Sequence, residues 1–161
     1  YLSGSITHNA DFEMILPVIK KIMKKYNNVY LKIVGELNIP TELNEFKNRI
    51  IFAPFVSWKK LPEIIASLDI NLAPLEDTIF NEAKSENKWV EAALCKVCTV
   101  ASNVGAFKKC IINNENGLYL IDNYSPEIQI EASLFIGLII SHLPNSSSSI
   151  LSKLIWRNEE K

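Results

Sequence analysis

Residues 69–102 read DINLAPLEDTIFNEAKSENKWVEAALCKVCTVAS and carry the strongest indication of the fold. Two short apolar runs, DINLAPL at 69–75 and CTVAS at 98–102, predict strands, and SENKWVEAALC at 85–95 predicts a helix between them. A strand, a helix and a second strand at this spacing indicate a βαβ unit of a parallel sheet. Ligands bind such sheets beyond the carboxyl ends of the strands, so the polar start of this helix is a candidate site.

Outside this unit the chain repeats the alternation of apolar and amphipathic runs. Further strands are predicted by YLSG at 1–4, VYLKIVG at 29–35, RIIFA at 49–53 and NGLYLI at 116–121. Further helices are predicted at 11–26, 41–47, 58–68, 105–112 and 126–143. Asp11 is the expected cap of the first of these helices, and Pro17 fits a first-turn or kinked position in it.

Six strands alternating with helices predict the fold class. We expect an α/β fold, a Rossmann-like doubly wound parallel sheet of about six strands with helices on both faces. The length fits one domain, residues 1–161, in which 123–161 form a helical C-terminal part.

The composition excludes several classes of protein. Of 161 residues, 48% are hydrophobic and 22% are charged, an ordinary balance for a folded domain. The formal net charge of −1 lacks the basic excess that a DNA- or RNA-binding surface needs. No apolar run approaches the ~18 residues that cross a bilayer. We therefore expect neither a nucleic-acid partner nor a transmembrane segment.

The start of the chain and its cysteines bear on its context. The chain begins YLSGSITH, without Met and inside an expected strand, so we take it as a segment of a longer polypeptide and expect half of the active site outside it. Three cysteines without a disulfide framework suit a reducing compartment. Cys95 and Cys98 form a C-x-x-C to which only Cys110 could be added. Zinc or redox chemistry is the alternative; we expect buried thiols and no metal site.

Two expected strand-to-helix loops carry groups that suit a phosphate. GSITHN at 4–9 offers Gly4 for close approach of a ligand, with Ser5 and His8 as donors. The second loop, GELN, begins at Gly35. Neither loop is a G-x-G-x-x-G or a P-loop, so each is only a candidate part of a nucleotide site.

The third loop leads into the 85–95 helix. Lys84, Lys88 and Glu91 are spaced four and three residues apart, which places them on one helix face. Because a helix N-terminus favours anions, this face is a candidate site for a phosphorylated ligand. The alternative is a Lys88–Glu91 ion pair on a solvated face, worth only a few tenths of a kcal/mol.

The order of these segments resembles the C-terminal, donor-binding domain of retaining glycosyltransferases of family 4, which have the GT-B fold of two Rossmann-like halves. YLSGSITHNADFEMI is similar to the family's glycine loop and first helix, and YLKIVGE to its second strand. SENKWVEAALCKVCTVASNVGAFKKCIINNENGLYL is similar to its Glu-bearing helix, its G-x-P-x-V-A strand and its G-x-x-E…NG close, with Lys96-Val97-Cys98 in place of G-x-P. The resemblance covers residues 1–122 and is most specific at 69–120.

The resemblance implies roles for residues of the third loop and its helix. Glu91 stands at the second Glu of the family's Glu-x7-Glu pattern, which holds the ribose hydroxyls of the nucleotide. Ser85, Lys88 and Glu91 match the variant S-P-x-K-x-x-E, whose Lys lies against the diphosphate; Glu86 replaces the Pro. Glu82 is the nearest counterpart of the first Glu, which contacts the transferred sugar, although eight residues rather than seven separate it from Glu91.

Other positions depart from the family. Its Arg and Lys aimed at the diphosphate are replaced by Ser5 and Ala10, which leaves His8 and Lys88 as the expected phosphate partners. Lys84, on the same helix face as Lys88, is a further candidate for donor binding. Lys108 or Lys109 occupies the place of the Glu in G-x-x-E.

The function that the resemblance implies is that of a retaining, metal-independent glycosyltransferase. The ligand would be a nucleotide-diphosphate sugar donor, with no separate cofactor. The acceptor, a glycan or a lipid-linked acceptor, would bind through a missing N-terminal domain, so we expect no turnover from this chain alone. The location would be cytoplasmic, at the inner membrane face in the full-length protein. The alternatives are a non-catalytic nucleotide- or sugar-binding module of a multidomain protein and a GT-B-like nucleotide-sugar epimerase.

Overall fold

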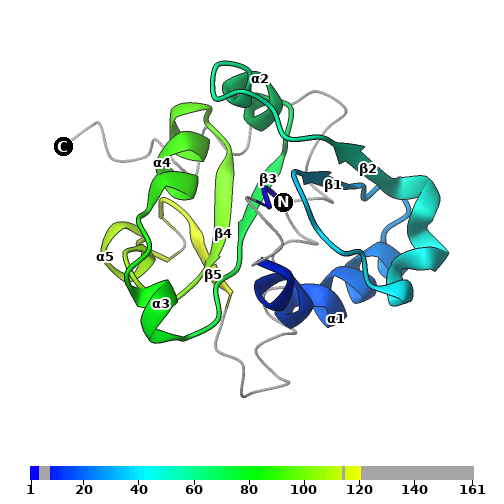
Figure 1. The fold of residues 1–161 in the computed structure, drawn as a ribbon, viewed down its shortest axis with the longest axis horizontal. Coiled ribbons are helices and arrows are strands. Elements are labelled where there is room, and N and C mark those ends of the chain that lie inside the picture. Colours follow the sequence, from blue (N-terminus) through cyan, green and yellow to red (C-terminus); the bar gives the residue numbers. More distant parts are fainter. Residues whose placement is uncertain (4–7, 114, 121–161) are drawn as a thin grey trace.

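The structure is a computed structural model, and it describes residues 1–3, 8–113 and 115–120 (Figure 1). Helices and strands alternate along the chain as expected. In order, the elements are α1 (Asn9–Lys25), β1 (Leu31–Val34), the 3-10 helix η2 (Thr41–Arg49), β2 (Ile50–Ala53), α2 (Leu61–Ala66), β3 (Ile70–Ala73), α3 (Ile79–Glu82), α4 (Asn87–Leu94), β4 (Cys98–Ser102), α5 (Phe107–Cys110) and β5 (Leu118–Leu120). The expected helix at 126–143 lies outside the described residues.

All strand pairs among the described residues are parallel, as predicted. One sheet pairs β1 with β2, and the other has the order β3-β4-β5. The expected first strand is present only as an isolated parallel bridge between Leu2 and Val34. Residues 1–3, 8–113 and 115–120 therefore contain five strands where six were expected. In Figure 1 the start of the chain lies between the two sheets. Leu2 packs there with Val34 and Ile65, in a cluster that also contains Ala92 of α4.

Alternate residues of the strands face two different layers of helices. On β1, Ile33 packs against α1, and its neighbour Val34 packs against Ile65 of α2. On β3, Leu72 contacts the α1 cluster, while Ala73 packs with Phe107 of α5. Because successive side chains of a strand point to opposite faces, α1 and η2 cover one face, and α2, α4 and α5 cover the other. This is the two-layered covering of a doubly wound sheet.

Helix α1 forms from an amphipathic run whose apolar positions recur at helical spacing. Its buried hydrophobic residues are Phe12, Ile15, Leu16, Val18, Ile19, Ile22 and Met23. The helix begins at Asn9, two residues earlier than predicted, so Pro17 lies in its interior rather than in its first turn. The pyrrolidine ring is on the exposed side of the helix. Asp11 is not the cap: His8 holds that position, although its side chain makes no capping hydrogen bond to the helix backbone, and Asp11 is buried in the first turn.

Two short elements differ from the sequence expectation. Helix α3 was expected to be loop; it is a single turn that Thr78 caps by accepting a hydrogen bond from the Asn81 backbone N–H at 3.2 Å. The run at 41–47 forms a 3-10 helix, η2, whose Leu43 and Phe46 are buried against α1. Helix α3 matters for function because it lies between the end of β3 and the start of α4.

Candidate nucleotide-sugar site

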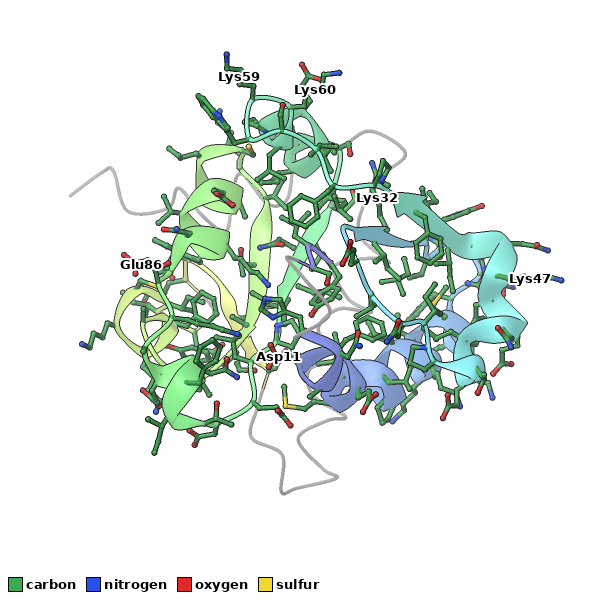
Figure 2. All side chains as sticks on the ribbon, in the orientation of Figure 1. Asp11, Lys32, Lys47, Lys59, Lys60 and Glu86 are labelled. Carbon is green, nitrogen blue, oxygen red and sulfur yellow. The ribbon has the colours of Figure 1, made fainter. Side chains whose placement is uncertain are left out.

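The candidate site lies where the carboxyl end of β3 meets the first turns of α1 and α4. Asp11, at the start of α1, is 2% exposed and reaches the loop after β3. Figure 2 shows Asp11 in the middle of the molecule, whereas Lys47, Lys59 and Lys60 point outward. The carboxyl end of a parallel strand is the edge at which doubly wound folds bind ligands. The structure therefore brings expected site residues from distant parts of the chain to the expected edge.

Lys88 is in the first turn of α4, and its Nζ is buried without a hydrogen-bond partner among the described residues. The ammonium lies 5.5 Å from the centroid of the Tyr1 ring. The α4 turn itself is held in place because the Asn71 side chain of β3 donates a 3.0 Å hydrogen bond to the Lys88 carbonyl. Burial lowers the pKa of Lys88 to about 8, an effect that the nearby Asp11 carboxylate opposes and the Lys84 ammonium reinforces. A buried cation without a partner is costly unless an anion joins it.

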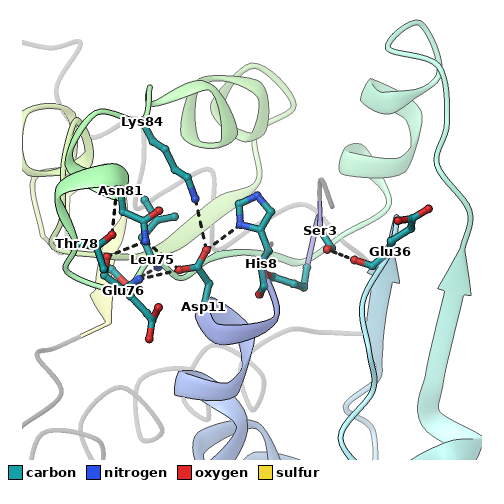
Figure 3. Close-up of polar contacts among 11 residues, drawn as sticks. Ser3, His8, Asp11, Glu36, Leu75, Glu76, Thr78, Asn81 and Lys84 are labelled. Carbon is teal, nitrogen blue, oxygen red and sulfur yellow. Dashed lines mark hydrogen bonds and ion pairs between the residues drawn. The ribbon is translucent and has the colours of Figure 1, made fainter. Parts of the chain in front are cut away.

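Asp11 contacts two of the expected donor-binding residues, His8 and Lys84, as Figure 3 shows. His8 Nδ1 lies 2.8 Å from Asp11 Oδ2, and Lys84 Nζ lies 3.6 Å from the same oxygen. Burial lowers the pKa of His8 below its usual value; the hydrogen bond to Asp11 opposes this, and the Lys88 and Lys84 charges add to it. His8, Lys84 and Lys88 thus form one cluster around a single buried carboxylate, and its two lysines make it a cationic cluster.

Glu91 and Ser85 lie on the same segment as Lys88 but have different surroundings. Glu91 is half-buried, close enough to Lys88 to favour its charged form. Within the described ranges no ion pair joins Lys88 to Glu91, so the alternative of a solvated Lys88–Glu91 pair is not what the structure forms. Ser85 is exposed in the turn before α4. The structure places both residues beside Lys88, and their binding roles stay predictions.

Glu82, the predicted sugar contact, is in a different position from the cationic cluster. It ends helix α3, and its carboxylate accepts a 2.6 Å hydrogen bond from Lys108 Nζ. This hydrogen bond lowers the pKa of Glu82, and a hydrogen bond from the Gly105 backbone acts in the same direction. Glu82 therefore joins α3 to α5, and Lys108, which stands where the family has Glu, is its partner. A contact between Glu82 and a sugar stays a prediction.

Of the glycines in the first two loops, Gly35 is among the described residues and Gly4 is not. Gly35 follows β1 with φ +96°, and a Cβ there would lie 2.1 Å from the Ser3 carbonyl oxygen. The Ser3 hydroxyl also donates a hydrogen bond to the Glu36 carbonyl. Glycine at 35 is thus required by the packing of the chain start against β1, whether or not a ligand approaches. Gly4 and Ser5 lie outside the described residues.

The cysteines are free thiols. Cys98 is buried and Cys95 and Cys110 are half-buried. Burial raises the pKa of the Cys98 thiol to about 11, so it is an unreactive thiol at neutral pH. In the part of the chain that the structure describes, no three His, Cys, Asp or Glu residues are grouped as a metal ion would need. Nor does that part contain a helix long and apolar enough to cross a bilayer.

Two residues of the site were missed by the sequence analysis. Asn81 Nδ2 donates to Asp11 Oδ1 at 3.2 Å and to the Glu76 carbonyl at 2.9 Å, and it is buried. Asp11 was assigned only a capping role. Its position three residues after His8, in the first turn of a predicted helix, was the available signal, because side chains at that spacing are neighbours.

Taken together, a parallel α/β sheet with a cationic cluster at its carboxyl edge defines a Rossmann-like domain. A family model described as "Glycosyl transferases group 1" matches residues 1–135. The chain belongs to this family of glycosyltransferases. A comparison with curated proteins gives no match.

Several solved structures share the fold of this chain. The chain is similar to the C-terminal domain of the group 1 glycosyltransferase LpcC from Francisella tularensis, with TM-score 0.61, 21% identity, and 87% of this chain and 73% of that one covered. It is also similar to HepE from Anabaena in complex with UDP and glucose, with TM-score 0.58, 17% identity and coverage of 78% and 35%. A third is the pneumococcal O-GlcNAc transferase GtfA in complex with UDP and GlcNAc, with TM-score 0.62, 11% identity and coverage of 87% and 28%.

These likenesses show the fold. They confirm the expectation of a Rossmann-like domain that forms one half of a GT-B glycosyltransferase. This chain spans about a third of the length of HepE and less of GtfA.

Proposed function

We propose that this domain binds the nucleotide-diphosphate sugar donor of a glycosyltransferase, with Lys88, Lys84 and His8 around the diphosphate and Glu91 on the ribose. The observation that carries the proposal is the buried Nζ of Lys88, which has no hydrogen-bond partner in the part of the chain that the structure describes. The diphosphate would supply the anion that this ammonium lacks. Glu91 lies one turn further along the same helix, and in this proposal it would accept hydrogen bonds from the ribose hydroxyls.

The two ammonium groups of the cluster would attract an anionic ligand. Lys84 and Lys88 carry positive charges that the Asp11 carboxylate and, one turn further along α4, Glu91 oppose. Low exposure of these groups reduces screening by solvent, so a phosphate here interacts more strongly than it would at an open surface. As the sugar leaves, negative charge builds up on the diphosphate, and preorganised ammonium groups stabilise that charge.

Two similar proteins support the choice of ligand. HepE and GtfA were each determined with UDP. We extend to this chain the class of ligand, a nucleoside diphosphate, and use UDP as the probe.

The remaining parts of the proposal concern the whole protein. We propose that transfer proceeds with retention and without a metal ion, the lysines serving to neutralise the diphosphate. The acceptor, a glycan or a lipid-linked acceptor, would bind to a domain outside this chain. Without that domain, the chain would show no turnover. We place the reaction in the cytoplasm, at the inner membrane face, since the three cysteines are free thiols.

The test is the substitution Lys88→Met, which keeps the long stem and removes the charge. If Lys88 holds the diphosphate, UDP loses about 10-fold or more in affinity, the range of a charge-assisted hydrogen bond, while uridine is unaffected. Isothermal titration calorimetry of the wild-type and Lys88→Met chains measures the affinity for UDP and the affinity for uridine. The loss shrinks as salt rises, because ions screen the interaction.

Lys47→Met is the matched control. It makes the same chemical change at an exposed lysine of η2 that points outward in Figure 2. The control leaves UDP binding unchanged. If Lys88→Met alters UDP and uridine binding equally, or neither, the phosphate role is wrong.

A further inference from the structure

The two oxygens of the buried Asp11 carboxylate have different kinds of partner. Oδ1 accepts hydrogen bonds from the Glu76 backbone N–H at 2.8 Å and from Asn81 Nδ2 at 3.2 Å. Both donors belong to the segment that follows β3. Oδ2 instead contacts His8 Nδ1 at 2.8 Å and Lys84 Nζ at 3.6 Å. One oxygen therefore anchors the carboxylate to the fold, and the other holds the side chains of His8 and Lys84 in the candidate site (Figure 3).

This arrangement sets the tautomer of His8. A carboxylate only accepts hydrogen bonds, so the Nδ1 of His8 carries the proton that it shares with Asp11. In the neutral ring Nε2 is then unprotonated and makes no hydrogen bond among the described residues. A phosphate oxygen is also only an acceptor. It can bind at Nε2 only after this nitrogen has gained a proton.

We propose that Asp11 is a positioning residue of the donor site: it holds Lys84 and the His8 ring toward the diphosphate and makes phosphate binding take up a proton at His8 Nε2. The proposal rests on the donor-binding function above. It adds a role for Asp11 and the uptake of a proton by His8 when the ligand binds. Asp11 does not touch the ligand; it acts through His8 and Lys84.

The charged groups around His8 give the direction of the pH dependence. They are Asp11 on α1, Lys84 before α4 and Lys88 on α4; the Tyr1 hydroxyl also donates a 3.2 Å hydrogen bond to the His8 carbonyl. Burial and the two lysines lower the pKa of His8 in the empty site, so the ring is mostly neutral at pH 7. A bound diphosphate adds negative charge and raises that pKa. Affinity therefore increases as pH falls toward the pKa of the empty site.

The experiment measures UDP binding by calorimetry at pH 7 in two buffers of different ionisation enthalpy, which gives the protons taken up. Wild-type chain is compared with Asp11→Asn and His8→Gln, and with Asp69→Asn as control. Asp69 is exposed at the amino end of β3, so this control removes the same charge far from the site. The β-phosphate of UDP itself titrates near pH 6, and the difference between wild type and His8→Gln removes its contribution.

We expect that wild type and Asp69→Asn take up more protons on binding UDP than His8→Gln does. In Asp11→Asn an amide N–H can donate to Nδ1, which moves the remaining ring proton to Nε2 and abolishes the extra uptake. With Lys84 no longer held, UDP affinity also falls about 10-fold. His8→Gln tests the same proton independently if Asp11→Asn fails to fold.

Two outcomes overturn the positioning role and differ from failure of the donor function. One is Asp11→Asn that takes up as many protons as wild type. The other is unchanged or tighter UDP binding by Asp11→Asn, which would mean that Asp11 only repels the ligand and joins α1 to the loop after β3. In both cases UDP still binds and Lys88→Met still weakens it. No UDP binding by wild type, or indifference to Lys88→Met, overturns the donor function itself.

Discussion

At the residue scale, the buried position of Lys88 is the feature that the proposed ligand would explain. Its ammonium is buried, and Asp11, the nearest buried carboxylate, is already bonded by His8 and Lys84. The sequence analysis identified Lys88 from its helix face and from the family pattern, because both signals are local. It missed the role of Asp11, since two of its partners, Glu76 and Asn81, are 65 and 70 residues away in sequence.

The same burial predicts that Lys88 destabilises the empty domain. The lowering of its pKa from 10.5 to about 8 corresponds to about 3 kcal/mol at neutral pH. Lys88→Met should therefore raise the free energy of unfolding by about 1–3 kcal/mol at pH 7, as measured by urea denaturation without ligand.

The pH dependence gives the check on this explanation. Between pH 8 and 10.5 the unfolded chain binds the Lys88 proton and the folded chain does not. The free energy of unfolding of the wild type therefore rises through this window, and its difference from that of Lys88→Met becomes smaller. A variant that is less stable than wild type at pH 7, with a constant difference at higher pH, would show that Lys88 contributes by packing or pairing instead.

At the element scale, most helices and strands followed from periodicity, and the exceptions have local causes. Helix α3 is a single turn, too short to show a period, and it forms because Thr78 caps it. Helix α1 continues through Pro17, because burial of its apolar face outweighs the hydrogen bond that proline lacks. The isolated pairing of Leu2 with Val34 could not be read from sequence, because it depends on how the chain start packs against Gly35.

The end of helix α4 offers a prediction at this scale. Lys96 has φ +60°, and its N–H and that of Val97 donate to Ala93 and Ala92, which is a Schellman motif. The resemblance had shown that Lys96 stands where the family has Gly. Lys96→Gly should stabilise the domain by about 0.5–1 kcal/mol in thermal or urea unfolding, since glycine adopts this conformation without steric cost.

Lys47→Gly is the contrasting substitution. It replaces an exposed lysine inside η2, where the backbone is helical, and should lose about 1 kcal/mol. Equal effects at the two positions would mean that the left-handed conformation of Lys96 does not limit stability.

At the scale of the whole molecule, the alternation of elements predicted the parallel sheet and its two helical layers, and the fold then determines which edge binds the ligand. The order of segments along the chain placed Lys84, Lys88 and Glu91 at the carboxyl edge. It could not place Glu82, which pairs with Lys108 on α5, because this contact joins elements that no sequence period relates.

The central claim is that a nucleoside diphosphate binds at this edge. The most direct measurement is a titration of isotope-labelled chain with UDP, followed residue by residue through the backbone amide signals in NMR. The account predicts that signals of His8 and of the segment from Lys84 to Glu91 shift with saturation, while those of Asp69 and Lys96, at the amino ends of β3 and β4, do not. Shifts centred on Asp69 and Lys96, with His8 and Lys88 unchanged, would contradict it.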